Sequence, residues 1–150
     1  MNPAAPINSA ENLGSLLSKV RAELVRAIEA EIAEKGIELR YIQYVILKKL
    51  IWLGTVSATE LARAVELDGG AMTRQLDQLE RKGYLRRQPH AQDRRALRIE
   101  ITAAGEAEYQ LLTHCNERAM AAAQRSLSAL ERDQLHDYLE RVLHALRNKD

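Results

Sequence analysis

Apolar residues recur every three or four positions over most of this chain, which is the spacing of an amphipathic helix. The same spacing predicts helices over residues 10–35, 40–53, 58–65, 70–82, 103–126 and 128–147. Gly36, Gly54 and Gly83 follow three of these segments and end them. Residues 1–8 have no periodicity and contain two prolines, which predicts a disordered start.

The pattern changes to strict alternation near residue 100. Leu97, Ile99 and Ile101 alternate with Arg98 and Glu100, as in a strand with one buried face. Residues 85–88 are the expected partner strand, and the polar residues 89–95 join the two. We therefore predict a mostly α protein with one small β-hairpin, of the α+β class.

Capping residues mark where several of the helices begin. Ser57 and Thr59 are candidate N-caps of helix 58–65, and Ser57 with Glu60 fits a capping box. Ser128 with Glu131 fits another, at the start of the last helix. These signals fix the helix starts more firmly than periodicity alone.

Helix 70–82 has one apolar and one polar face. Met72, Leu76 and Leu79 lie on the apolar side, whereas the opposite side and its flank are polar. The polar residues there are Thr73, Arg74, Asp77, Gln78 and Arg81. The Asp68-Gly69-Gly70 sequence before it is a turn signal, so a helix–turn–helix pair precedes the hairpin.

Positive charge gathers in the same part of the chain. Residues 70–98 contain eight Lys and Arg against three Asp and Glu, whereas the whole chain has a formal net charge of +1. A basic patch on a nearly neutral protein is typical of a nucleic-acid-binding surface.

Composition excludes several other classes of protein. The lone Cys115 rules out an intrachain disulfide and suits a reducing cytoplasm. The start does not resemble a signal peptide, and no apolar run approaches the length of a membrane span. The four histidines form no recognisable metal-ligand set, and we find no nucleophile–base pair or phosphate-binding loop, so we expect neither a metal site nor an enzyme.

Residues 68–102 resemble the DNA-binding core of the MarR family of transcriptional regulators, particularly its SlyA-like members. The matching landmarks are Leu76, Leu79, Gly83, Arg87, Asp93-Arg94-Arg95 and the strand from Leu97 to Thr102. The resemblance implies a winged helix–turn–helix domain over 37–102 and a helical dimerisation region over 9–36 and 103–150. It also implies a homodimer on double-stranded DNA, with a pseudo-palindromic operator and half-sites about one helical turn apart.

Reach and charge suggest which residues contact DNA. Thr73, Arg74, Gln78 and Arg81 face the major groove, although Arg81 is far enough along the helix to touch only phosphate. Ser57 and Thr59 suit phosphate at a helix N-terminus. By resemblance, Arg95 enters the minor groove, Asp93 holds it in place and Arg94 lies near the backbone.

The resemblance further implies a pocket for a small aromatic or phenolic effector between the dimer helices and the winged domain. The candidate lining residues are Arg40, Tyr41, Tyr44, Trp52 and Tyr109, each of which would alternatively be plain core. We expect a repressor, with an activator as the alternative. A winged-helix module that binds proteins is a competing interpretation.

Cys115 has two interpretations. It is either a thiol whose oxidation switches the regulator or, as we favour, a small buried apolar residue.

Overall fold

The computed structural model describes residues 11–89, 92 and 97–148. The predicted disorder of residues 1–8 and the wing residues Asp93, Arg94 and Arg95 lie outside this part of the chain. The described elements are α1 (Leu13–Glu34), α2 (Tyr41–Leu53), β1 (Val56–Ser57), α3 (Ala58–Val65), α4 (Gly69–Arg81), β2 (Leu85–Pro89), β3 (Leu97–Ile101), α5 (Ala103–Ala123) and α6 (Ala129–Arg147).

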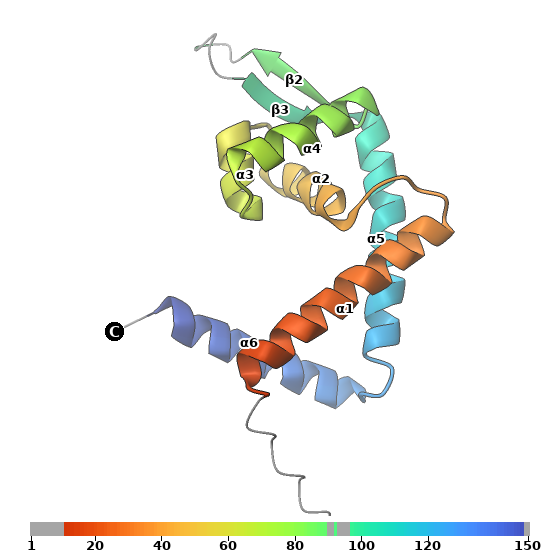
Figure 1. The fold of residues 1–150 in the computed structure, drawn as a ribbon, viewed down its shortest axis with the longest axis vertical. Coiled ribbons are helices and arrows are strands. Elements are labelled where there is room, and N and C mark those ends of the chain that lie inside the picture. The colour runs from red at the N-terminus through yellow and green to blue at the C-terminus, as the bar shows by residue number, and fades with distance from the viewer. Residues whose placement is uncertain (1–10, 90–91, 93–96, 149–150) are drawn as a thin grey trace, which may run out of the picture.

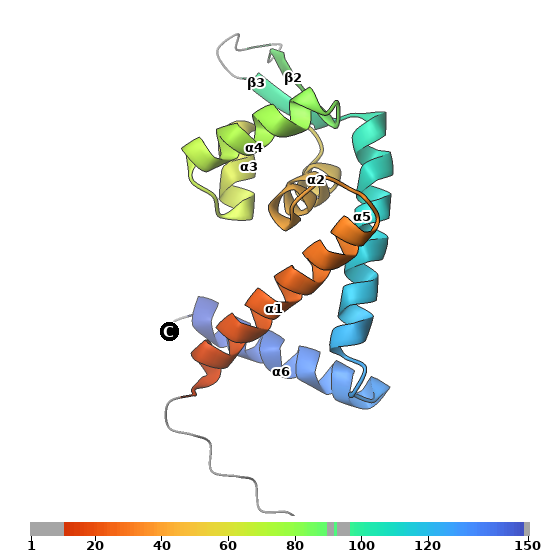
Figure 2. The ribbon, with the colours of Figure 1, turned by 45° about the vertical axis from the view of Figure 1, so that its right-hand side comes forward.

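The elements form two regions joined by α5 (Figure 1). One region contains α2, α3, α4 and the sheet. In the other, α1 packs against the part of α5 far from the sheet, and α6 leads away from the end of α5 (Figure 2). The predicted mostly α fold with a small hairpin is confirmed. No described helix is both long and apolar enough to cross a membrane.

The sheet has one strand more than the sequence predicted. Its order is β1-β3-β2, and both pairs are antiparallel. Val56 of β1 pairs with Ile99 of β3, and Leu85 of β2 pairs with Ile101. Two residues are too few to show an alternating pattern, so β1 becomes a strand only because the edge of β3 is available to it.

The core forms around α2. Ile46, Leu47 and Leu50 of α2 are at most 1% exposed, and they belong to the same buried cluster as Leu76 of α4 and Ile99 of β3. Burial covers one side of α2. The apolar residues of α2 lie around much of its circumference, which predicts a deeply packed helix, but this prediction is wrong because Trp52 remains 77% exposed.

Most helix ends agree with the capping signals. Ser57 and Ser128 cap α3 and α6 as predicted, each within a capping box. Thr59 is not an N-cap, because it lies within the first turn of α3. Helix α1 begins at Leu13 rather than residue 10, since Asn12 supplies its cap.

Two helices expose large apolar side chains. Helix α6 has no buried residue at all. The N-terminal half of α1 behaves similarly, although Ile28 and Ile32 further along are buried against the core. The exposed apolar side chains are Leu13, Leu16, Leu17 and Val20 on α1, and Leu130, Leu135, Tyr138, Leu139, Leu143 and Leu146 on α6.

Candidate nucleic-acid interface

Local hydrogen bonds build the helix–turn–helix. The Ser57 hydroxyl oxygen accepts from the backbone N–H of Glu60, and the Glu60 carboxylate accepts from the N–H of Ser57, each at 3.1 Å. Helix α3 ends at Val65 and is capped by Glu66, which adopts a left-handed conformation with φ of 58°. The Asp68 carboxylate then caps α4 by accepting from Ala71 N–H at 2.8 Å. The sequence indicated a turn here but not this cap.

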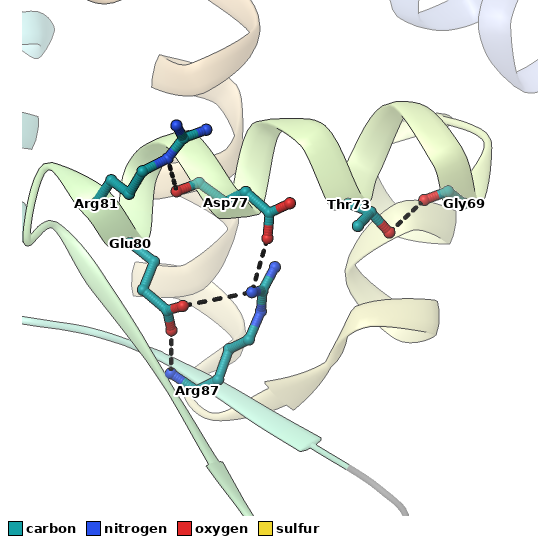
Figure 3. A network of polar contacts seen from close by, with 6 residues as sticks. All are labelled: Gly69, Thr73, Asp77, Glu80, Arg81 and Arg87. Carbon is teal, nitrogen blue, oxygen red and sulfur yellow. Dashed lines mark hydrogen bonds and ion pairs between the residues drawn. The ribbon is translucent and has the colours of Figure 1, made fainter.

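Helix α4 has the two faces that the sequence predicted. Met72, Leu76 and Leu79 are at most 1% exposed. The four polar candidates Thr73, Arg74, Gln78 and Arg81 are all exposed. The Thr73 hydroxyl donates to Gly69 O at 2.8 Å, and Arg81 Nε donates to Asp77 O at 3.3 Å, as Figure 3 shows. Among the described residues, neither Arg74 nor Arg81 has an acidic partner within ion-pair distance.

Arg87 ties β2 to α4 (Figure 3). One of its terminal nitrogens lies 2.8 Å from Asp77 Oδ1 and 3.3 Å from Glu80 Oε1. Its backbone N–H donates to the other Glu80 oxygen at 3.1 Å. With 21% of its side chain exposed, Arg87 belongs to a bridge between helix and hairpin rather than to a free cationic surface.

Other cations of the basic segment also have partners. Arg86 pairs with Glu100 across the hairpin, and Lys82 lies 3.9 Å from Glu38. Arg98 donates to the carbonyl of Thr55 at 2.7 Å. The charge count along the sequence therefore overstates the free positive charge of the two strands. Within the part of the chain that the structure describes, the cations of α4 without an acidic partner are Arg74 and Arg81.

The hairpin lies on the outer side of α4 and points away from the rest of the molecule (Figures 1 and 2). Its last described pair joins Pro89 to Leu97, and Leu97 is 48% exposed. Close packing holds its other end, where the Thr102 hydroxyl donates to Gly83 O at 2.6 Å. A Cβ on Gly105, in the first turn of α5, would lie 2.0 Å from Tyr84 O. An isolated glycine in a helical pattern was the only sequence signal of this contact.

Four of the five effector-pocket candidates lie close together. The rings of Tyr44 and Tyr109 stack at 5.9 Å, and Tyr41 lies 6.3 Å from Tyr44. Arg40 is next to them along the chain, but its Nε donates to Glu29 at 2.9 Å. Trp52 stands apart, because it is at the other end of α2 and exposed.

Burial dominates the chemistry of two of the core side chains. It raises the pKa of the Tyr44 hydroxyl above its ordinary value. Burial likewise raises the pKa of the Cys115 thiol, and the nearby Glu31 carboxylate adds to the effect. Cys115 is 1% exposed, so the structure favours the buried apolar interpretation over a reactive thiolate.

Comparison with known proteins gives the same architecture. A family model described as the MarR family matches residues 39–97. Wild-type MarR from E. coli in its apo form shares 25% identity with a TM-score of 0.80, covering 89% of this chain and 97% of that one.

Two other solved structures share the fold. A mutant E. coli MarR complexed with operator DNA has 24% identity and a TM-score of 0.76, covering 93% and 99% of the two chains. Bordetella bronchiseptica BpsR, whose DNA binding is regulated by 6-hydroxynicotinic acid, has 20% identity and a TM-score of 0.78, covering 97% and 100%. The MarR family model thus matches the winged domain of this chain, and the solved MarR structure also shares the arrangement of the helices around it.

Proposed function

We propose that this chain is a homodimeric, sequence-specific DNA-binding transcriptional regulator of the cytoplasm whose operator binding responds to a small effector. The observation that carries the proposal is the exposed face of α4, which presents Thr73, Arg74, Gln78 and Arg81 beside a projecting hairpin. The operator complex of E. coli MarR and the ligand regulation of BpsR support it by analogy.

In this proposal α4 lies in the major groove, where the guanidinium of Arg74, which has no acidic partner among the described residues, binds guanine O6 and N7. At the wing, Arg95 enters the adjacent minor groove, Asp93 holds Arg95 in place and Arg94 lies near the DNA backbone. At the start of α3, the exposed Thr59 is better suited to a phosphate than Ser57, because the capping box already engages Ser57.

The proposed dimer uses the apolar faces of α1 and α6. Contiguous exposed apolar surface on this scale usually marks a protein interface. A groove between α1 and α5 lies beside these faces and is lined largely by small apolar side chains such as Ala27, Ala119 and Ala122. A second copy covering these surfaces would place two α4 helices on successive turns of DNA.

The proposed effector site lies where α1, α2 and α5 meet, near Tyr44 and Tyr109. A small aromatic acid would pair with Arg40 only by displacing the Glu29 carboxylate. Since Glu29 belongs to α1 and Arg40 precedes α2, such a ligand would favour a different spacing of dimer helices and winged domain. We propose that operator binding represses transcription. Mapping the operator relative to its promoter would distinguish repression from activation.

Selection from a random duplex library, followed by salt titration of the selected site, tests the proposal. A two-fold symmetric site with a steep salt dependence is the expected result. Arg95→Ala should weaken operator binding strongly without changing the dimer or its melting temperature. If no sequence is enriched, the chain is instead a winged-helix module for protein partners.

A further inference from the structure

Gln43, in the first turn of α2, is the single buried polar side chain among the residues that the structure describes, with 2% exposure. A buried amide must use its hydrogen-bonding groups, because leaving one unpaired is costly. Both of its polar atoms have a partner. One of these partners is Gln78 on the exposed face of α4, 35 residues away in the chain.

The first partner fixes which way the Gln43 amide points. Its Oε1 accepts from the backbone N–H of Arg40 at 3.0 Å. A backbone N–H can only donate, so the oxygen of Gln43 must be the atom that faces it. The Nε2 of Gln43 consequently faces α4.

The orientation of Gln78 follows from that of Gln43. Gln43 Nε2 donates to Gln78 Oε1 at 2.9 Å, and an amide nitrogen can only donate. The oxygen of Gln78 is therefore turned inward, and its NH₂ group remains for whatever lies against the exposed face of α4. Gln78 alone, with a freely rotating amide, would present either group.

We propose that Gln43 is a positioning residue that makes Gln78 a hydrogen-bond donor to DNA and so sets the base preference at one position of each half-site. This inference rests on the proposed function. A donor selects acceptors in the major groove, of which guanine offers two (O6 and N7), adenine one (N7), thymine one (O4) and cytosine none. The bidentate contact between glutamine and adenine needs the oxygen that Gln43 engages.

Neighbouring contacts hold Gln43 itself in place. The Glu29 carboxylate of α1 accepts from Arg40 Nε at 2.9 Å and from the N–H of Tyr41 at 3.1 Å. These bonds fix the backbone at the start of α2, including the N–H that orients Gln43. A series of polar contacts thus runs from α1 to the face of α4 that meets DNA.

Gln43→Glu tests the proposal because it reverses the polarity with almost no change in size. A carboxylate still accepts from Arg40 N–H, but its second oxygen also accepts, so Gln78 must turn and donate its NH₂ inward. The amide oxygen of Gln78 then faces the groove and selects the donors adenine N6 or cytosine N4. In duplex selection, we expect wild type to enrich guanine and disfavour cytosine at this position, and Gln43→Glu to raise cytosine relative to guanine by about fivefold.

Matched variants make the result decisive. Gln78→Ala should remove the preference at that position in both the wild-type and the Gln43→Glu backgrounds. Gln43→Met keeps the length of the side chain without a donor, and it should reduce the preference even if Gln43→Glu fails to fold. An unchanged base preference in a folded, DNA-binding Gln43 variant, or in Gln78→Ala, would overturn the inference. Failure of wild type to enrich any sequence would instead refute the proposed function.

Discussion

Replacing Arg87 by methionine removes the cation that joins β2 to α4 while keeping the aliphatic stem. Two ion pairs are lost, to Asp77 at 2.8 Å and to Glu80 at 3.3 Å. The side chains of these acids are 45% and 40% exposed, so they can be hydrated once the guanidinium is gone. No uncompensated buried charge is created, which keeps the cost moderate.

The size of the effect follows from this exposure. Exposed ion pairs contribute about 0.2–1 kcal/mol each, and Arg87 is more buried than a typical surface arginine. The two pairs together should therefore contribute about 1–2 kcal/mol to the free energy of unfolding. For a chain of 150 residues this is a decrease in melting temperature of roughly 3–8 °C.

The assay combines stability with the salt dependence of operator binding. Melting is measured at one fixed protomer concentration, since a dimer's stability depends on it. Arg87→Met should weaken operator binding by the same factor at every salt concentration. The guanidinium of wild-type Arg87 is paired with Asp77 and Glu80, so it releases no counterions from DNA on binding. Arg81→Met is the control, since Arg81 is the α4 arginine expected to touch only phosphate; it should leave melting nearly unchanged but lower the salt slope by about 1.8, or 0.9 for each protomer.

The opposite pattern would refute this reasoning. If Arg87→Met lowers the salt slope as Arg81→Met does and leaves the melting temperature unchanged, then Arg87 contacts phosphate. The basic residues of the segment would in that case act together, as the charge count along the sequence suggests.

Three further predictions concern stability and redox chemistry. Gly105→Ala should reduce the free energy of unfolding by about 1–3 kcal/mol in denaturant titration, because the added Cβ would lie 2.0 Å from Tyr84 O. Gly69→Ala is the control and should cause no such loss, because a Cβ at that position would have no neighbouring atom within 4 Å. Cys115→Ser should leave the response of DNA binding to peroxide unchanged, and a response that disappears in this variant would show that the thiol is a sensor. The hydrogen bond from arginine lowers the pKa of Glu29 below its ordinary value of 4.5, so its contribution to stability is present above about pH 4.5 and is lost as the pH falls through the lowered pKa. The stability difference between wild type and Glu29→Gln should accordingly shrink in acid, and a difference that stays constant to pH 2 would contradict the assignment.

The sequence correctly predicted the helix starts and buried faces that depend on a short stretch of chain. The capping box of Ser57 and Glu60 sets the start of α3, and the spacing of Met72, Leu76 and Leu79 sets the buried face of α4. These features depend on hydrogen bonds and on helical geometry within a few residues, so periodicity and residue type suffice to predict them. The resemblance in residues 68–102 further indicated the MarR family.

Only the tertiary structure decided which side chains meet across the fold. It pairs Arg87 with acids on α4, places Trp52 at the surface, adds β1 to the sheet and brings Gln43 against Gln78. Such contacts join residues from different elements, and their formation depends on how helices and strands pack. The sequence does not show which residue a charged or amide side chain will contact in the folded protein. The resemblance of this chain to a family can therefore be predicted from local sequence pattern, whereas the groups that it presents on the exposed face of α4 depend on long-range contacts.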